Sequence, residues 1–340
     1  MRPEQILRLS DFWATRIILA AVELDLFPHL HEPISAETLA DRRELNPEAT
    51  ARLLSALVAL DILAPYGDQF VIREELKEAL SDEPASIIPR LKQRARLWKT
   101  WSALPEVVRT GKDYYELYDP EGREAENERP ASRPVALNNS RMAKEVVAKL
   151  NLEGVSRILD VGGAPGAYAY EFCEALVQVE VTILDMKDEC EVARQALEQT
   201  PYKDRVKVIE GDALEIDDKE VIGEDNNGRF DIVFMSNLIH SMTREQVSKL
   251  MKRCLKWVKP GGRIIVKDFM LDEGRSSPPR GAIFAVNLLV STPGGNCYTW
   301  TEVDDWLKNA QYETGKSHVR QSIRISLSDN ASGMIVAEIR

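Results

Sequence analysis

The chain has 340 residues, 44% of them hydrophobic, which suits a globular protein of two domains. Its formal net charge of −11 argues against a nucleic-acid-binding surface, because such a surface needs an excess of Lys and Arg. No run of about 18 uncharged apolar residues occurs, and acidic residues lie close to the first apolar stretch, so we expect no membrane span, no signal peptide and, by default, a cytoplasmic location. The four cysteines form no CxxC pair, so we expect reduced thiols and no metal site.

Residues 1–105 are expected to form an all-α domain that ends in a short hairpin. Ser35 and Asn46 each precede a helical pattern and suit N-caps. The segment 64–72, APYGDQFVI, then has a turn between two extended pieces, which completes a winged-helix arrangement. Proteins use that arrangement for DNA reading or for dimerisation, and 13 Lys or Arg against 16 Asp or Glu in this region favour dimerisation. The first long helix is expected to bury one apolar face, formed by Phe12, Ile17, Ile18, Ala21, Val22 and Leu26.

Two charged stretches lie near the end of the expected first domain and just after it. The basic residues of 90–99 alternate with Leu and Trp at helical spacing, which favours a solvated helix face over a nucleic-acid-binding surface. Residues 106–150 are expected to be a helical linker region, and within it residues 119–135 combine prolines with charges and predict an exposed connection.

Residues 151–340 alternate between strand and helix patterns, which predicts a mostly parallel sheet with helices on both faces. Two further strands are expected near residues 315–326 and 332–339, which makes a seven-stranded, Rossmann-like α/β domain. A KPGG turn at 259–262 is expected to start the fifth strand. The five segments predicted as buried strands are RILDV, VEVTILD, RVKVIEG, FDIVFM and GRIIVKDFM.

The first of these strands runs into a glycine-rich turn, Asp160-Val-Gly-Gly-Ala-Pro-Gly166, followed by a helical pattern. Ligands of parallel sheets bind at this carboxyl end of the strands. Gly162, Gly163 and Gly166 would let the backbone approach a ligand closely or take a positive φ. A nicotinamide dinucleotide would require G-x-G-x-x-G, which this spacing does not match. The turn alone remains a weak signal.

Two more acids follow at the next strand ends. Asp185 ends the second strand, where a carboxylate can accept hydrogen bonds from both hydroxyls of a ribose. The third strand ends at Gly211-Asp212-Ala213, where the carboxylate could accept from an adenine amine while Met186 and Ala213 line the faces of the base. Together with Asp160, these acids suit a ligand that carries a sulfonium and an ammonium better than a pyrophosphate. The pattern therefore predicts S-adenosylmethionine as the cofactor.

The fourth strand leads into Ser236-Asn237-Leu238-Ile239-His240, which makes Ser236 a further cofactor-binding candidate and places His240 beside the cofactor. A lone histidine is more often structural than catalytic, so it needs support from geometry. Asp268 ends the adjacent fifth strand and could hold one ring nitrogen protonated, which leaves the other to take a proton from a substrate hydroxyl. Alternatively, Asp268 pairs with Lys267 or caps the following loop.

These motifs resemble the class I O-methyltransferases of the acetylserotonin, caffeic acid and hydroxyindole type, which have an N-terminal winged-helix dimerisation domain. The resemblance extends over nearly the whole chain. It implies that the glycine-rich turn and the acids bind S-adenosylmethionine, that His240 is the general base and that Asp268 is the acid beside it. It also implies a homodimer in which the N-terminal domain of one chain helps to close the pocket of the other. The segments on which the resemblance rests include AVELDLFPHL, LDVGGAPGAYA, EGDAL, SNLIHSM and TPGGNCYTWTEVDDWL.

The chain departs from this family at several positions. Ala164 stands where the family usually has glycine, and Ser241-Met242 follow the histidine in place of Asp-Trp. Ser236 occupies a position that is often basic, and Cys297 replaces a second flanking acid of the plant enzymes. These changes cluster on the acceptor side and resemble bacterial members with diverse acceptors, including carbon methylators and members that have lost methyl transfer.

The sequence thus favours methyl transfer to a hydroxyl of a small molecule, because aromatic and aliphatic residues are available to line an apolar pocket. Carbon methylation or a non-methylating role within the family is the main alternative. A nicotinamide-dependent oxidoreductase and a DNA-binding winged-helix regulator are further alternatives. The residues that could line the pocket are Trp98, Trp101, Phe284, Trp300 and the run IFAVNLLV.

Overall fold

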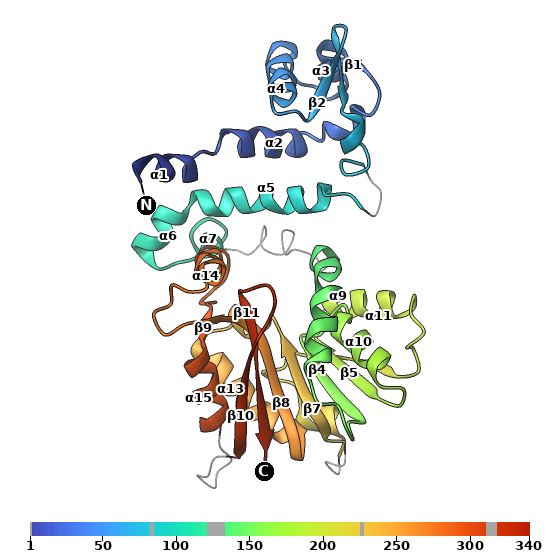
Figure 1. Cartoon of the computed structure of the whole chain (residues 1–340), viewed down its shortest axis with the longest axis vertical. Helices are drawn as coiled ribbons and strands as arrows, with labels where there is room; N and C mark the ends of the chain where they lie inside the picture. Colours follow the sequence, from blue (N-terminus) through green and yellow to red (C-terminus); the bar gives the residue numbers. More distant parts are fainter. Residues whose placement is uncertain (1, 82–84, 121–132, 225–227, 311–317) are drawn as a thin grey trace. The chain divides into compact units, whose positions relative to one another are not determined.

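The computed structural model describes residues 2–81, 85–120, 133–224, 228–310 and 318–340 (Figure 1). The chain divides into two compact units, Met1–Ser102 and Ala103–Arg340. The second unit therefore contains what is described of residues 106–150, while most of the predicted exposed connection lies outside the described residues. Within these ranges, no helix is both long and apolar enough to cross a membrane.

The first unit has the predicted arrangement of helices followed by a hairpin. Ser35 Oγ accepts a hydrogen bond from Thr38 N at 3.1 Å and Asn46 Oδ1 accepts from Ala49 N at 2.9 Å, so both predicted N-caps are confirmed. Phe12 was wrongly placed on the buried face, because it is the N-cap residue of α2 and is 52% exposed. The elements are α1 (Pro3–Leu9), α2 (Trp13–Glu23), η1 (Phe27–His29), β1 (Ile34–Ser35), α3 (Ala36–Arg42), α4 (Pro47–Ala59), β2 (Leu63–Tyr66), β3 (Gln69–Ile72), η2 (Glu74–Leu76) and α5 (Ile88–Ser102).

The second unit is built on the predicted sheet of mostly parallel strands, whose order is β10-β11-β8-β7-β4-β5-β6. The strands β4 to β8 pair in parallel, while β11 is antiparallel to β8 and β10 is antiparallel to β11. A short strand, β9 (Tyr298–Thr299), pairs with the end of β8. The seven main strands are β4 (Arg157–Val161), β5 (Glu180–Asp185), β6 (Val206–Glu210), β7 (Phe230–Ser236), β8 (Val258–Leu271), β10 (Val319–Ser326) and β11 (Ser332–Ile339).

The KPGG segment at 259–262 does not precede the fifth strand, as predicted, but lies inside β8. Phe230 of β7 pairs with Val258, and after a register shift Ile232 pairs with Arg263. Because Pro260 has no N–H to donate to a ladder, the chain bulges here and regular pairing resumes beyond it. The fifth strand is therefore longer than its pattern of β-branched residues indicates.

Helices cover both faces of the sheet, as the alternating pattern predicts (Figure 1). One face packs against α9 (Arg133–Ala148), α10 (Ala167–Ala175) and α11 (Lys187–Leu197). The other packs against α12 (Asp218–Ile222), α13 (Arg244–Trp257) and α15 (Trp300–Asn309). Near the carboxyl ends of the strands lie η3 (Ile239–Ser241), α6 (Leu104–Thr110), α7 (Tyr114–Tyr118) and α14 (Pro279–Ser291).

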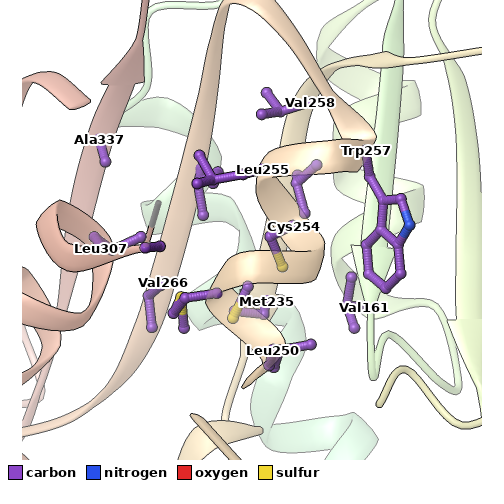
Figure 2. Packing of buried hydrophobic residues seen from close by; sticks show 14 of the residues in the cluster. Val161, Met235, Leu250, Cys254, Leu255, Trp257, Val258, Val266, Leu307 and Ala337 are labelled. Atoms are coloured by element: carbon purple, nitrogen blue, oxygen red, sulfur yellow. The ribbon is translucent and has the colours of Figure 1, made fainter. Parts of the chain in front are cut away.

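Helix α13 shows why the sequence folds in this way. Its buried side chains recur at helical spacing, and each fully buried one stabilises the fold by ~1.5–3 kcal/mol. Figure 2 shows Leu250 and Cys254 of this helix close to Met235 and Val266 of the sheet. Thr243 is the N-cap of this helix and forms a capping box with Gln246. All four cysteines are free and buried, and three of them lie in helices.

Candidate active site

The glycine-rich turn connects β4 to α10 and packs directly on Asp160. A Cβ atom on residue 163 would lie 2.4 Å from the carboxyl carbon of Asp160, so only glycine permits this close approach. Gly166 begins α10 with φ +110°, a conformation that other residues rarely adopt. Gly162 also has a positive φ and donates its N–H to Leu184 O at 2.8 Å.

Asp160 is 1% exposed, and neither of its carboxyl oxygens has a hydrogen-bond partner among the residues described. Burial and, to a lesser extent, the neighbouring Asp185 raise the pKa of Asp160 to about 8. Buried polar atoms in proteins are normally paired, and an acid without a partner implies that a donor or a cation completes the site. This observation supports a positively charged ligand group at the turn.

Asp185 ties the turn to the next strand. One carboxyl oxygen accepts from Ala164 N at 3.0 Å and the other from Met186 N at 2.8 Å. Burial raises the pKa of Asp185, although the two backbone hydrogen bonds oppose the shift. The carboxylate is therefore fixed at the carboxyl end of β5 and lies close to Asp160.

The third strand end lies next to the second. Gly211 donates its N–H to Asp185 O at 2.9 Å, and Asp212 is exposed with its Oδ1 accepting from Leu214 N at 2.8 Å. Ala213 is partly buried against the core, and Met186 is 53% exposed. All of the residues predicted to hold the nucleoside part of the cofactor thus meet at one edge of the sheet.

His240 and Asp268 are in contact, as the adjacency of the fourth and fifth strands predicts. His240 Nδ1 lies 2.6 Å from Asp268 Oδ1, and the backbone N–H of His240 donates to Asp268 Oδ2 at 3.3 Å. The N–H of Phe269 donates to Asp268 Oδ1 at 2.8 Å. The Asp268 side chain is 1% exposed and that of His240 is 14% exposed. The alternative pairing of Asp268 with Lys267 is not among the ion pairs found in the described residues, and Lys267 Nζ donates to Asn237 Oδ1 at 2.8 Å.

The charge of Asp268 follows from these partners. Burial alone would raise its pKa, but His240, by attraction and hydrogen bonding, and Lys267 bring the pKa below its usual value. An anionic Asp268 accepts the Nδ1–H of the imidazole, so the Nε2 atom is the ring nitrogen left for another partner.

Aromatic residues form one wall beside the histidine. The ring of Phe284 lies edge-on to His240 with centroids 5.2 Å apart, and Phe269 lies 4.4 Å from Phe284. Cys297 is fully buried in the same cluster, and burial, followed by the proximity of Asp268, raises the pKa of its thiol to about 12. Trp300, predicted as a lining residue, is the first residue of α15 and packs against the hydrophobic core of the sheet instead. Trp98 and Trp101 belong to the first unit.

Sequence reasoning missed two contacts that hold the histidine segment. Asn296 N donates to His240 O at 2.8 Å, which connects the loop after α14 to the histidine. Asn237 has φ +55° and receives the Lys267 hydrogen bond. Asparagine is among the few residues that adopt a positive φ readily, so an asparagine directly after the fourth strand was the sequence signal for this turn.

Two family models match this chain. The model of the O-methyltransferase domain matches residues 101–313, and the model of the O-methyltransferase dimerisation domain matches residues 7–72. The chain therefore belongs to the O-methyltransferase family. It is an S-adenosylmethionine-dependent enzyme of that family, with a dimerisation domain in its N-terminal part.

Individual relatives agree with this assignment. The chain is 27% identical over 334 residues to 3-hydroxy-5-methyl-1-naphthoate 3-O-methyltransferase of Streptomyces sahachiroi, which covers 96% of this chain and 92% of that enzyme. It is 26% identical to acetylserotonin O-methyltransferase of Macaca mulatta, over 84% of this chain and 85% of that enzyme. The fold is shared with human N-acetylserotonin methyltransferase in complex with S-adenosylmethionine, with a TM-score of 0.69, 22% identity and coverage of 100% and 99%.

Replacing Asp160 with Asn is expected to stabilise the ligand-free protein. The pKa of Asp160 is about 8 in the folded chain against an ordinary 3.8, so the folded state keeps a proton that the unfolded state has lost. Wild-type stability should therefore fall between about pH 4 and about pH 8, by ~1 kcal/mol per pH unit. Thermal unfolding without cofactor should show Asp160→Asn melting above wild type by a margin that grows with pH. A margin independent of pH would contradict the unpaired state of Asp160.

Proposed function

We propose that this enzyme transfers a methyl group to a hydroxyl of a small aromatic or conjugated molecule, with His240 as the general base. The observation that carries the proposal is the 2.6 Å contact between His240 Nδ1 and Asp268 Oδ1, next to an aromatic wall at the cofactor edge of the sheet. His31, by comparison, has its Nε2 3.3 Å from the backbone oxygen of Leu80.

The residues of the edge fit S-adenosylmethionine, which supplies an activated methyl group on a sulfonium. The unpartnered oxygens of Asp160 would receive its ammonium, and Asp185 its ribose hydroxyls. Asp212 would accept from the adenine amine, between Met186 and Ala213. The glycines let neighbouring side chains pack against the turn, and we propose that their backbone also contacts this ligand. These residues are Gly162, Gly163, Gly166 and Gly211, with Ser236 at the end of the next strand.

The His240 side chain can act on the acceptor. Asp268, held anionic, fixes the Nδ1–H tautomer and leaves Nε2 free to take the hydroxyl proton as oxygen approaches the methyl carbon. The resulting imidazolium is stabilised by the same carboxylate. Because the sulfonium is already a good leaving group, the chain mainly supplies alignment, with reacting atoms roughly 3 Å apart, and removal of one proton.

The variant His240→Ala is expected to lower turnover by at least about a hundredfold, because general-base catalysis contributes on that order. Binding of S-adenosylhomocysteine, measured by calorimetry, should persist, since the proposed cofactor contacts do not include this side chain. The matched control is His29→Ala in the first unit, which should keep wild-type turnover. If His240→Ala also keeps wild-type turnover, the base is misassigned.

We propose that the acceptor is aromatic, because Phe269 and Phe284 form the wall next to the base. The relatives from Streptomyces include methyltransferases whose names specify hydroxylated aromatic acceptors. Oxygen is favoured over carbon as the methylated atom because His240 and Asp268 together provide a base, which a hydroxyl needs before attack.

Transfer of labelled methyl groups to a panel of phenols should give methyl ethers as products, identified by mass spectrometry. The matched controls are the same compounds with the hydroxyl already methylated, which should receive no label. Labelling of carbon in the blocked compounds would contradict the assignment and support the alternative of carbon methylation.

We propose that the chain forms a homodimer through its first helices. None of the α1 residues is buried within the chain, and Leu7 is 70% exposed, Leu9 76% and Trp13 73%. An exposed apolar surface of this kind indicates a protein interface, and it overlaps residues matched by the dimerisation model.

The double variant Leu7→Glu, Leu9→Glu is expected to convert the dimer to a monomer, because two charges would be buried at the interface. Light scattering on a sizing column should report a mass halved relative to wild type. Arg8→Glu, on the same helix, is the control and should remain dimeric. A wild-type protein that elutes as a monomer would refute this interface.

A further inference from the structure

A buried lysine lies at the same edge of the sheet as the proposed cofactor residues. Lys267 of β8 is 4% exposed and sits opposite Ser236 of β7 in the strand register. Its ammonium makes one hydrogen bond among the described residues, to Asn237 Oδ1. Burial lowers the pKa of Lys267, although Asp268 and Asp329 oppose the shift. An ammonium has three donors, so this buried cation has capacity for another acceptor.

Two buried hydroxyl groups lie close to each other, one of them on Ser236, the residue opposite Lys267 in the register, and the other on Tyr168. Tyr168 is 4% exposed, its ring lies 4.9 Å from Phe234, and its hydroxyl has no hydrogen-bond partner among the described residues. The Ser236 hydroxyl is also buried and unpartnered. Burial raises the pKa of Tyr168 to about 12, an effect that the nearby Ser236 hydroxyl partly offsets. Each hydroxyl therefore keeps hydrogen-bonding capacity that the described residues do not satisfy at normal hydrogen-bond distance.

These donors share a face of the sheet with Asp160. Side chains alternate along a strand, so residues two positions apart point to the same face. Asp160, Ser236 and Lys267 each lie two positions after a member of the core cluster on the α9 and α10 face. Tyr168 comes from α10, which covers this face. The cluster members two positions earlier are Ile158, Phe234 and Ile265.

The spacing fits a zwitterion. Asp160 pairs with Phe234 of β7 and Lys267 with Ser236 of the same strand, so their Cα atoms are two strand spacings apart across the sheet and two residues apart along it, roughly 12 Å in all. The ammonium and carboxylate of an amino acid, each with one hydrogen bond of ~2.9 Å, span most of this distance, and the long lysine side chain can cover the remainder.

We propose that Lys267, Tyr168 and Ser236 hold the α-carboxylate of the methionine part of S-adenosylmethionine. This assignment rests on the proposed placement of the ammonium at Asp160. The anion then receives one charged and two neutral donors, and the two buried charges of opposite sign, Asp160 and Lys267, each obtain a partner from one ligand. A purely structural Lys267 would instead serve only to hold Asn237 in its left-handed conformation.

Calorimetry with two ligands tests the assignment on the full chain without acceptor. S-adenosylhomocysteine carries the carboxylate, and its decarboxylated analogue keeps the adenosine and the ammonium. Lys267→Met is expected to weaken S-adenosylhomocysteine binding by about tenfold or more, because a charge-assisted hydrogen bond is lost. The same variant should bind the analogue within about twofold of wild type. Tyr168→Phe should show the same selectivity with a smaller loss.

Three further variants keep the result interpretable. Lys207→Met, at an exposed position of β6, should bind both ligands like wild type. Lys267→Arg keeps the positive charge and should bind S-adenosylhomocysteine more weakly than wild type but selectively, which provides a second test if Lys267→Met unfolds. Asp160→Asn should weaken both ligands equally, because both keep the ammonium. If it weakens neither, the ammonium placement fails separately from the lysine. Equal losses of both ligands in Lys267→Met, or no loss, would overturn the carboxylate assignment.

Discussion

The site depends on one constraint of parallel sheets, which is that all strands running in the same direction end at the same edge. β4, β5, β6 and β7 end there next to one another, and β8 passes the same level before it reaches Leu271. Residues far apart in sequence therefore meet, and Asp268 reaches His240 although 28 residues separate them. The helices on both faces make the edge rigid by burying the strands between two apolar clusters.

At this edge, two equally buried acids behave in opposite ways because their partners differ. Asp160 and Asp268 are each 1% exposed. Asp268 has a histidine, a backbone N–H and a nearby lysine, and its pKa falls. Asp160 has no hydrogen-bond partner in the described chain and a second acid beside it, and its pKa rises to about 8. The chain thus gives one acid the partners that keep it charged and leaves the other without a partner, as the proposed roles in proton transfer and cofactor binding require.

Much of this arrangement could be predicted from local sequence. The N-caps at Ser35, Asn46 and Thr243, the strands and the contact of His240 with Asp268 all follow from short patterns and strand order. The bulge at 259–262 could not be predicted, because its register depends on pairing with β7. The cluster at Lys267 was missed for a similar reason, since an isolated lysine between apolar residues gives no indication of which unpartnered hydroxyls of other elements lie beside it.

The presence of Cys297, where the resemblance implies a second flanking acid in the plant enzymes, has a physical consequence for His240, the proposed base. Two carboxylates facing one imidazole would repel each other and raise the pKa of one of them. The buried thiol stays neutral because burial and Asp268 raise its pKa to about 12. Asp268 therefore remains the sole anionic partner found for His240 in the described residues, and the thiol joins Phe269 and Phe284 in the apolar cluster. The acceptor side of the histidine is made more apolar without loss of the charge that fixes its tautomer, which suits an uncharged aromatic hydroxyl better than a polar acceptor.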